Sequence, residues 1–328
     1  KPPRRTDFET AASSGQITFF NPREEYVKHL RNVVDLLAIQ KRRWKIAYDP
    51  LFGAGAGFLN AVLETPVAEL HGEANPSFGG IHPEPIAKNL GPFIEFIKQQ
   101  KADVGLTTDG DADRIGAIDE NGQFVTPHQI FALLLNHLIE KGLRGDVVKT
   151  VSTTQMIDRI AALHGLTVHE TPIGFKHICA KFLETKPFIG GEESGGIGIP
   201  SHLYERDGLL AGLMLLEVMS VKGKRLGELV KELMREFGPL YFEREDLILS
   251  PEAQDRAREK LARNGVAKIG PLKVVRINPL DGMKFCLEDG SWLLIRPSGT
   301  EPLIRLYAEA ADPSLVRQLL TEGRKMIS

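Results

Sequence analysis

Residues 102–114 read ADVGLTTDGDADR, an apolar stretch that runs directly into three aspartates at alternating positions. The apolar half is typical of a buried β-strand, so the acidic half follows that strand's carboxyl end. Ligands of an open α/β sheet bind in the crevice outside the carboxyl ends of its strands. We therefore expect an α/β domain whose polar site contains Asp109, Asp111 and Asp113.

The segments around this strand alternate between helix and strand patterns. The expected elements are a helix over residues 26–37, a strand over 44–49, a helix opened by glycines at 53, 55 and 57, a strand over 66–70, a hairpin over 115–124 and a helix over 128–141. The polar segment GLRGD then predicts a domain boundary near residue 145. Residues 1–22 are polar, basic and rich in proline and serine, so we expect a linker there.

The alternation returns beyond this boundary and then stops. Strands are expected over residues 147–152, 166–172 and 187–191, with helices over 156–165, 177–185 and 207–220. Such alternation favours mostly parallel sheets covered by helices on both faces. From about residue 243 the pattern becomes several strands with two helices, which favours an antiparallel sheet with helices on one face. The predicted fold is two doubly wound three-layer α/β domains, residues 23–145 and 146–243, followed by a smaller α+β domain, residues 244–328.

The composition is that of a soluble protein with ample material for buried cores: 42% of the residues are hydrophobic, 26% are charged and the net charge is -2. This balance gives no reason to expect nucleic acid or a membrane as a partner. The sequence has no apolar run of about 18 residues, and its start lacks the apolar core of a signal peptide. Cys179 and Cys286 match no metal or redox spacing. We therefore expect a reduced, cytoplasmic setting.

The acidic residues of the first domain have a physical reason to bind a metal. Carboxylates as close as Asp109, Asp111 and Asp113 repel one another, and a hard divalent cation such as Mg2+ relieves that repulsion through oxygen ligands. Arg114 beside them suits a phosphate, because its planar fork can hold phosphate oxygens. We predict a magnesium site on a phosphate-handling loop.

Three other interpretations of these residues remain open. A solvated acidic turn needs no ligand. A calcium-binding EF-hand loop fits the three aspartates and Glu120 at its first, third, fifth and twelfth places, but Arg114 stands where that loop needs glycine and the preceding segment is strand-like. An aspartyl-phosphate phosphatase would use one aspartate as its nucleophile, although such a motif more commonly opens a domain.

The segment WLLIRPSGTEPLIRL, residues 292–306, gathers cations, hydroxyls and backbone amides around one turn between two strands. The residues concerned are Arg296, Ser298, Gly299, Thr300 and Arg305. Charge-assisted bonds from arginine, with hydroxyl and amide donors on a glycine-containing loop, are an ordinary means of holding a phosphate dianion. A solvated hairpin with incidental charge is the alternative interpretation.

The segment PFIGGEESGGIGIP, residues 187–200, presents Glu192, Glu193 and Ser194 on a glycine-rich backbone after a strand. Carboxylates and hydroxyls match the hydroxyls of a sugar, although many glycine-rich loops bind nothing. The segment TPIGFK also follows a strand and is a weaker candidate, because a lone loop lysine is usually only solvated. Its residues of interest are Thr171, Gly174 and Lys176.

The motifs DGDADR, TPIGFK, GGEESGG and RPSGTEP, in this order, resemble those of the α-D-phosphohexomutase family, the phosphoglucomutases and phosphomannomutases. The segment DPLFGAG resembles the start of that family's second domain. The resemblance implies an intramolecular phosphotransferase that interconverts hexose 1-phosphate and hexose 6-phosphate. It also implies a phosphoserine on the enzyme and a hexose 1,6-bisphosphate as intermediate and activator.

The resemblance assigns a role to each motif. The implied residues are Asp109, Asp111 and Asp113 for Mg2+, Arg114 beside the transferring phosphoryl group, Glu192 and Ser194 for sugar hydroxyls, Thr171, Gly174 and Lys176 bordering the substrate, and Arg296, Ser298, Gly299, Thr300 and Arg305 for the phosphate that is not reacting. GEESGG is closer to glucose-type mutases than to the GEMSGH or GEQSGH of other members, since Gly196 replaces their histidine. Glucose is therefore the expected sugar.

The sequence departs from the family in one respect. The family's phosphoserine lies in a first domain within a motif like TASHNP, and the only related string here, AASSG at residues 11–15, lacks the histidine, asparagine and proline. We expect a piece of a larger mutase, inactive alone, with residues 1–22 as the linker from a first domain that is its partner. The alternative is a short form that binds hexose phosphate without catalysis.

Overall fold

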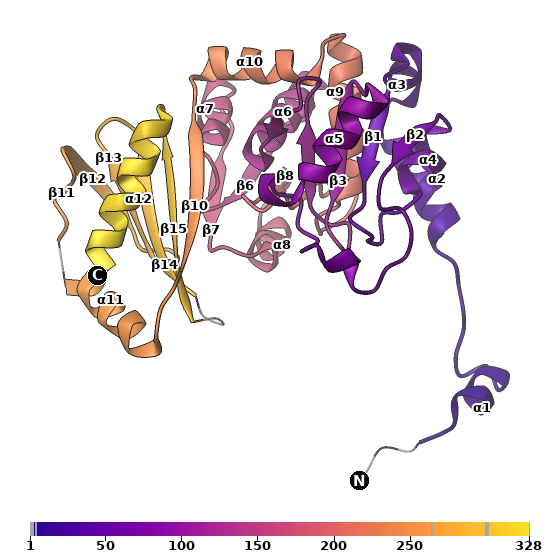
Figure 1. Ribbon diagram of the computed structural model, residues 1–328, viewed down its shortest axis with the longest axis horizontal. Helices are drawn as coiled ribbons and strands as arrows, with labels where there is room; N and C mark the ends of the chain where they lie inside the picture. The colour runs from indigo at the N-terminus through magenta and orange to yellow at the C-terminus, as the bar shows by residue number, and fades with distance from the viewer. Residues whose placement is uncertain (1–2, 4, 264, 299–301, 328) are drawn as a thin grey trace.

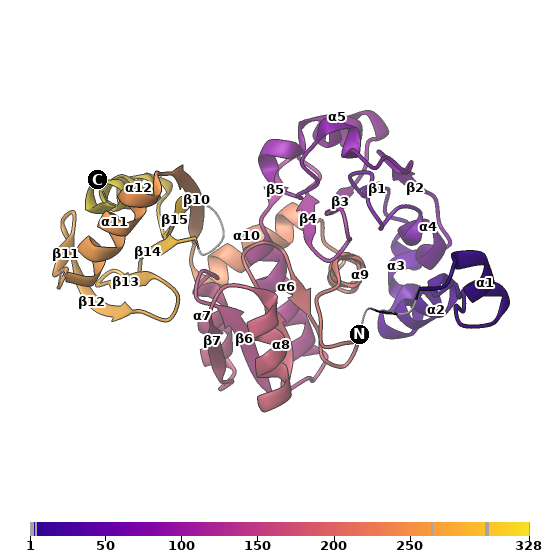
Figure 2. The ribbon, with the colours of Figure 1, turned by 90° about the horizontal axis from the view of Figure 1, so that it is seen from below.

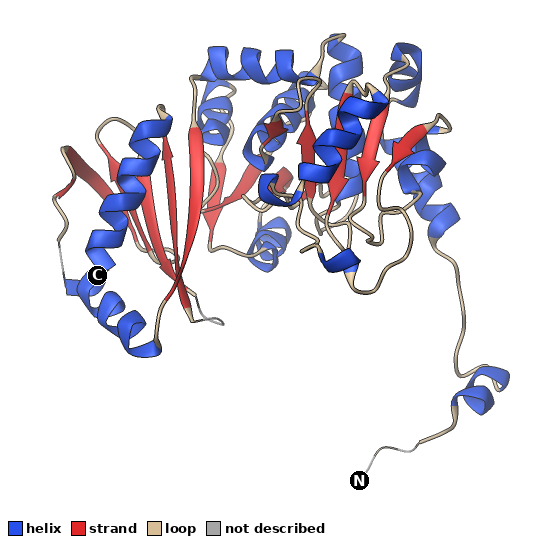
Figure 3. Ribbon diagram, viewed as in Figure 1, coloured by secondary structure: helices blue, strands red, loops and turns tan. Residues whose placement is uncertain are grey.

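The computed structural model describes residues 3, 5–263, 265–298 and 302–327, and three β-sheets follow one another along its length (Figure 1). Each sheet is built from one continuous part of the chain, spanning residues 46–125, 146–198 and 241–310. Helices flank the first two sheets, which are rich in parallel pairs, whereas the third sheet is antiparallel (Figure 3). The predicted fold class, two α/β units followed by a smaller α+β unit, is confirmed.

The first sheet has the strand order β2-β1-β3-β4-β5. Its strands are β1 (Ile46–Asp49), β2 (Val67–Glu69), β3 (Val104–Thr108), β4 (Ile115–Ile118) and β5 (Phe124–Val125). β1 pairs in parallel with β2 and β3, while β4 runs antiparallel to β3 and pairs with β5. The last two strands are the predicted hairpin, which turns at Gly122 with a φ of 76°. The acidic residues therefore leave the carboxyl end of the central strand.

Helices cover both faces of this first sheet. They are α2 (Arg23–Val33), α3 (Leu36–Arg42), α4 (Phe58–Leu63) and α5 (Gly91–Gln100), with short 3-10 turns η1 (Phe78–Gly80) and η2 (Ala87–Asn89). The single helix expected over residues 26–37 is wrong: Val34 is extended, and Asp35 caps a second helix by accepting the Ala38 N–H. α5 was not expected. A short helix, α1 (Phe8–Ser13), stands away from the body (Figure 1).

The second sheet has the order β7-β6-β8-β9. Its strands are β6 (Asp146–Thr150), β7 (Val168–Thr171), β8 (Pro187–Gly191) and β9 (Ile197–Gly198), and its helices are α6 (Pro127–Glu140), α7 (Met156–Leu163), α8 (Phe175–Glu184), α9 (Gly208–Lys222) and α10 (Leu226–Phe237). β6 pairs in parallel with β7 and β8, and β9 is antiparallel to β8. α6 follows the first sheet in sequence but packs on α7, α9 and α10. The domain boundaries near residues 145 and 243 stay predictions.

Helix α9 is apolar on every side because it is enclosed between the first two units. It packs on α3, α6, β3 and β4, and a single hydrophobic core runs through both units. Its one buried carboxylate, Glu217, accepts hydrogen bonds from His137 Nε2 at 2.9 Å, Lys141 Nζ at 2.6 Å and the Asp35 N–H at 3.1 Å. The first two units are therefore joined by a shared core rather than by a surface contact.

The third sheet has the order β10-β15-β14-β13-β12-β11. Its strands are β10 (Tyr241–Ile248), β11 (Lys268–Ile269), β12 (Leu272–Asn278), β13 (Met283–Leu287), β14 (Trp292–Pro297) and β15 (Leu303–Ala310), with helices α11 (Pro251–Arg263) and α12 (Pro313–Ile327) on one face (Figure 2). Its core is separate, and a small cluster of Val151, Trp292, Leu294 and Tyr307 joins it to the second unit. Among the helices in the described residues, none is both long and apolar enough to cross a membrane.

Candidate functional site

The acidic loop, residues 109–114, connects β3 to β4. One carboxylate oxygen from each of Asp109, Asp111 and Asp113 lies within 4.8 Å of the other two. Asp109 is fully buried, Asp113 is half-buried and Asp111 is exposed. The three predicted metal ligands therefore converge at one point that remains open to solvent.

The acidic loop rests on the glycine segment that follows β1. The Ala54 N–H donates to the Gly110 carbonyl at 2.9 Å, and a Cβ on Gly53 would lie only 2.5 Å from that oxygen. A Cβ on Gly55 would lie 2.1 Å from the hydroxyl of Tyr48, which is hydrogen-bonded to Thr108 Oγ1 at 2.7 Å. Residues without side chains are required here because the backbone approaches so closely.

The charges of the acidic loop are only partly balanced by the protein. Arg114 donates its N–H to Asp109 Oδ1 at 3.0 Å, its Nε to Asp109 Oδ2, and its Nη1 to Glu84 Oε1 at 3.2 Å. Asp113 Oδ1 is buried and has no hydrogen-bond partner among the described residues. Burial raises the pKa of Asp113 above its ordinary value, against the opposing charge of Arg206. An oxygen-only donor set with one unsatisfied oxygen fits a hard divalent cation.

The EF-hand interpretation is wrong. That motif needs a helix on each side of its loop, whereas the acidic loop lies between the strands β3 and β4. Glu120, which would supply the twelfth-place ligand, lies beyond β4 and accepts the Gly227 N–H at 3.0 Å instead.

The glycine loop, residues 192–196, connects β8 to β9 and turns its two glutamates in different directions. Glu192 is buried, and its Oε1 accepts from Ser194 Oγ at 2.7 Å, so the two predicted sugar ligands lie together. Glu193 Oε2 accepts from Ser152 Oγ at 2.6 Å and Thr150 Oγ1 at 3.2 Å, beyond the end of β6. Burial raises the pKa of Glu192 above its ordinary value, and the charge of Glu193 adds to this effect.

The acidic loop and the glycine loop are hydrogen-bonded to each other. Arg114 and Gly196 form an isolated antiparallel bridge, and the Ile115 N–H donates to the Gly195 carbonyl at 3.1 Å. A Cβ on Gly195, whose φ is 102°, would lie 2.5 Å from the Ile115 carbonyl. The Gly208 N–H at the start of α9 donates to the Ala112 carbonyl at 3.0 Å. The predicted metal and sugar residues thus belong to one contiguous unit.

Arg206, which no sequence motif predicted, bridges these two loops. Its Nε donates to Asp113 Oδ2 at 2.6 Å and its Nη1 donates to Glu192 Oε1 at 2.6 Å. Arg206 follows no motif that we assigned, and the only sequence signal was its place directly before Asp207, which caps α9. Its partners lie 93 and 14 residues away along the chain, so only the fold brings the three together.

The lysine loop, residues 171–176, runs from the last residue of β7 into the first turn of α8. Thr171 is buried at the end of β7, Gly174 precedes α8 with a φ of 118°, and Lys176 is exposed. The Ile173 N–H donates to Asp281 Oδ2 at 2.9 Å, which ties this loop to the third sheet. The same carboxylate oxygen accepts from Arg296 Nε at 2.9 Å.

The arginine turn, residues 296–305, joins β14 to β15 and places Arg296 directly opposite Arg305. A carboxylate lies beside each arginine: Asp281 beside Arg296, and Asp246, which also pairs with Arg244, beside Arg305, with Arg305 Nε 3.6 Å from Asp246 Oδ2. Ser298 is buried and donates its N–H to the Leu303 carbonyl at 2.9 Å. The remaining predicted phosphate residues, Gly299 and Thr300, lie outside the described residues.

A cavity of about 490 Å3 opens where the three units meet, within the ~300–1,000 Å3 range of small-molecule sites. Its lining includes Glu193 and Ser194 of the glycine loop, Glu84, and Arg244 of β10. Arg244 forms a two-point ion pair with Asp246, at 2.7 Å for both contacts, which connects this cavity to the arginine turn. Residues from all three units therefore surround one space.

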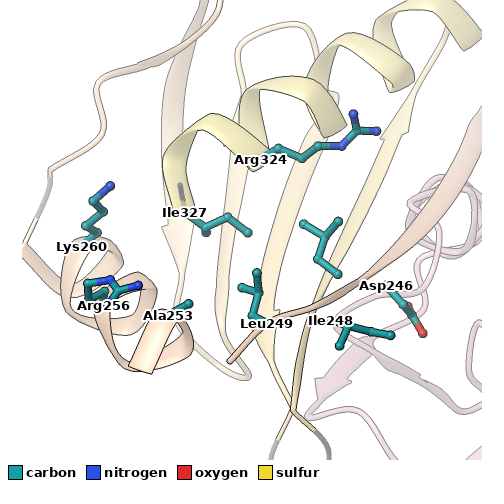
Figure 4. Close-up of a pocket in the computed structure, with 9 residues that line it drawn as sticks. Asp246, Ile248, Leu249, Ala253, Arg256, Lys260, Arg324 and Ile327 are labelled. Carbon is teal, nitrogen blue, oxygen red and sulfur yellow. The ribbon is translucent and has the colours of Figure 1, made fainter. Parts of the chain in front are cut away.

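A cavity of about 550 Å3 lies elsewhere, between β10, α11 and α12 (Figure 4). Its lining combines the apolar Leu249 and Ile327 with the cations Arg256, Lys260 and Arg324. These residues belong to the helices of the third unit and the end of β10 rather than to the four loops. We therefore locate the candidate site at the smaller cavity, which the glycine loop lines and which Glu84 connects to Arg114 of the acidic loop.

Three sequence profiles match consecutive parts of the chain. Residues 24–122 match "Phosphoglucomutase/phosphomannomutase, alpha/beta/alpha domain II", residues 126–237 match domain III of the same description, and residues 249–325 match its C-terminal domain. The profiles divide the first two units before α6, at residues 122–126, whereas we drew that boundary after α6.

Curated relatives and solved structures agree with these matches. A phosphoglucomutase/phosphomannomutase of Thermococcus kodakarensis is 33% identical over 92% of this chain and 64% of its own length. A Thermococcus gammatolerans protein described as a phosphoglucosamine mutase is 31% identical over 95% of this chain and 67% of its own. The structure of a Thermus thermophilus protein, described as a phosphomannomutase, superposes with a TM-score of 0.81 and 38% identity over 94% of this chain and 66% of that one. The chain thus spans about two thirds of the length of the proteins it matches.

Proposed function

Because this chain belongs to the phosphoglucomutase/phosphomannomutase family of phosphohexomutases, we propose that it forms part of an enzyme that interconverts hexose 1-phosphate and hexose 6-phosphate. The observation that carries the proposal is the hydrogen-bonded junction of the acidic and glycine loops, beside a cavity that β10 of the third sheet also lines. This junction supports a shared role for the metal and sugar groups, and the ion pair of Arg244 with Asp246 supports a link from the cavity to the arginine turn. The family assignment gives no support to the aspartyl-phosphate phosphatase interpretation.

In the proposed site, Asp109, Asp111 and Asp113 hold Mg2+, which when bound neutralises charge that spreads over a transferring phosphoryl group. The buried, unsatisfied Asp113 Oδ1 supports this assignment. Arg114 adds a guanidinium beside the same loop, where its fork can hold phosphate oxygens while Asp109 and Glu84 orient it.

Glu192 and Ser194 hold sugar hydroxyls in this proposal, with Lys176 and its loop at the border of the substrate. Their mutual hydrogen bond at 2.7 Å supports a shared role, because both groups can exchange it for bonds to a vicinal pair of hydroxyls. The arginine turn, with Arg296, Ser298, Gly299, Thr300 and Arg305, holds the phosphate that is not reacting. Asp281 supports this role, because its carboxylate orients the guanidinium of Arg296. Arg305 lies directly opposite Arg296 on the neighbouring strand.

The proposed reaction passes through a hexose 1,6-bisphosphate. A phosphoserine gives its phosphoryl group to one hydroxyl of the hexose monophosphate, the bisphosphate turns in the cleft, and its other phosphoryl group returns to the serine. We propose the receiving role for this chain, because its loops carry the candidate metal, sugar and phosphate groups. The groups on its loops bind and orient the two ends of the sugar phosphate.

We propose glucose as the sugar, because GEESGG with Gly196 is closest to the glucose-type motif. Glucosamine is the second candidate, since relatives of similar identity are described as phosphoglucosamine mutases. Calorimetric titration of the chain with glucose 6-phosphate and glucosamine 6-phosphate compares the two. Clearly tighter binding of the glucosamine phosphate would contradict the glucose proposal.

Binding is the decisive test of the function. We expect glucose 1-phosphate and glucose 6-phosphate both to bind in the presence of Mg2+, and the double variant Glu192→Gln with Ser194→Ala to lose at least about tenfold in affinity for each. Glu184→Gln is the matched control, because Glu184 is exposed and pairs only with Lys181 on the outer surface of α8 among the contacts found in the described residues. A wild-type chain that binds neither hexose phosphate would refute the proposal.

A further inference from the structure

We propose that Arg206 is a positioning residue that couples divalent-cation binding at the acidic loop to hexose-phosphate binding at the glycine loop. The inference rests on the proposed function, since it takes those two loops as the cation site and the sugar site. It adds a residue outside the four motifs and a linkage between their ligands.

The coupling starts from one guanidinium shared between two carboxylates. Arg206 Nε donates to Asp113 Oδ2 and Nη1 donates to Glu192 Oε1, each at 2.6 Å. Glu192 is 5% exposed, and the Arg206 side chain is 26% exposed. Charge-assisted hydrogen bonds in such a partly desolvated place are strong and directional. The position of each carboxylate therefore depends on the same side chain.

The backbone around Arg206 restricts the direction in which its side chain can point. Residue 206 forms an isolated bridge with Gly198, and the next residue, Asp207, caps α9 through the Leu210 N–H at 2.9 Å. The Arg206 side chain then passes over Gly196, where a Cβ would lie 2.7 Å from its Cδ. Because Gly196 has no side chain, the Arg206 side chain can lie against it and reach both carboxylates.

A cation at the acidic loop competes with Arg206 for Asp113. The guanidinium occupies Oδ2 while Oδ1 lacks a hydrogen-bond partner among the described residues, so a cation that takes both oxygens must weaken the bond to Arg206. Once it is released from Asp113, the guanidinium bonds Glu192 alone, and Nη1 holds that carboxylate in place for a sugar hydroxyl. Cation and hexose phosphate should therefore promote each other's binding, and the effect must be reciprocal.

This competition predicts a change in Mg2+ affinity whose direction a merely structural role of Arg206 would not produce. Arg206→Gln removes the competing charge, so we expect Mg2+ to bind about tenfold more tightly in the absence of sugar phosphate. The same variant should bind glucose 6-phosphate about tenfold more weakly, and Mg2+ should then enhance that binding less than in the wild type. If Arg206 only held the loops together, its loss would weaken both ligands.

The experiment measures Mg2+ and glucose 6-phosphate affinities by calorimetry, each alone and with the other saturating, at constant ionic strength. Mn2+ titration followed by electron paramagnetic resonance provides a second reading of the cation site. Arg206→Lys should restore only part of the coupling, because an ammonium group lacks the fork that spans two carboxylates. Arg225→Gln is the matched control, since Arg225 pairs with Asp103 at 3.1 Å away from the acidic loop.

A second variant tests the same competition without removing a charge. Gly196→Ala places a methyl group against Arg206 Cδ and should shift the guanidinium away from its carboxylates, which again tightens Mg2+ and weakens glucose 6-phosphate, by a smaller factor. If Arg206→Gln fails to fold, Gly196→Ala still tests whether Arg206 competes with the cation for Asp113.

The outcomes separate this inference from the proposed function. Mg2+ affinity that is unchanged or lower in both Arg206→Gln and Gly196→Ala, in a chain whose wild type binds glucose 6-phosphate, overturns the role of Arg206 and leaves the function standing. A wild type that binds Mg2+ but no hexose phosphate contradicts the function and the coupling together. Tighter Mg2+ with weaker sugar phosphate supports both.

Discussion

Replacing Glu217 with glutamine should destabilise the shared core of the first two units. Glu217 on α9 is 1% exposed and accepts hydrogen bonds from His137 of α6, from Lys141 after α6 and from the Asp35 N–H at the start of α3. Burial disfavours its charge, but the bonds from His137 and Lys141, with that from Asp35, lower the pKa of Glu217 to about 2. Its ionised form is therefore favoured by the folded state.

The magnitude follows from the difference between this pKa and the ordinary value of 4.5. The difference corresponds to about 3 kcal/mol of stability from the ionised group. Because the pKa is lowered on folding, this stability is fully present above about pH 4.5 and is lost as the pH falls towards about 2. A neutral glutamine cannot accept all three donors, so Glu217→Gln should lower the melting temperature by roughly 5–10 °C near pH 7.

Differential scanning calorimetry of the wild type and Glu217→Gln at several pH values between about 7 and 2.5 measures this effect. The gap between their melting temperatures should shrink steadily below about pH 4.5. Glu232→Gln is the control, because Glu232 pairs with Lys224 on the surface and should change the melting temperature little. A gap that is absent near neutral pH, or that does not narrow in acid, would refute the reasoning.

Three further outcomes are expected. Asp281→Ala removes the acceptor that aligns Arg296 and the Ile173 N–H. Glucose 6-phosphate should therefore bind about tenfold more weakly, while the Mg2+ affinity measured by calorimetry stays unchanged. Equal losses of affinity for both ligands would argue against this role of Asp281. Gly195→Ala introduces a Cβ 2.5 Å from the Ile115 carbonyl and should cost roughly 2 kcal/mol or more by urea denaturation, whereas Gly165→Ala, also at positive φ but with nothing nearby, should cost about 1 kcal/mol. Mg2+ at about 100 times its Kd should add ~2.7 kcal/mol of stability, and EDTA or Asp109→Asn should abolish that rise in melting temperature.

The fold was largely predictable because its patterns are local. The apolar stretch at residues 102–108, the hairpin turn at Gly122 and the alternation of strands and helices each reflect backbone periodicity or turn chemistry within a few residues. The errors also have local causes. Val34 and Asp35 divide one apolar periodicity into two helices. The spacing of the apolar residues does not predict such a break, because it depends on the backbone conformation at these two positions.

The candidate site was predictable only where one segment carries several polar groups. Asp109, Asp111 and Asp113 lie within five residues of one another, so their convergence follows from the loop itself. Asp281 and Arg206 carry no comparable signal. Asp281 meets the lysine loop 108 residues away, and it acquires its place through the contact between the second and third units.

By itself, the sequence determined the fold class, the order of the loops and the chemistry that each loop offers, because composition and short-range spacing set those properties. Only the tertiary structure decided which carboxylates share a guanidinium. Arg206 joins Asp113 to Glu192 because the glycine loop and the start of α9 pack directly on the acidic loop, through glycines at 195, 196 and 208 that leave no room for side chains. Such close packing depends on three distant segments at once, and no pattern along the chain encodes it.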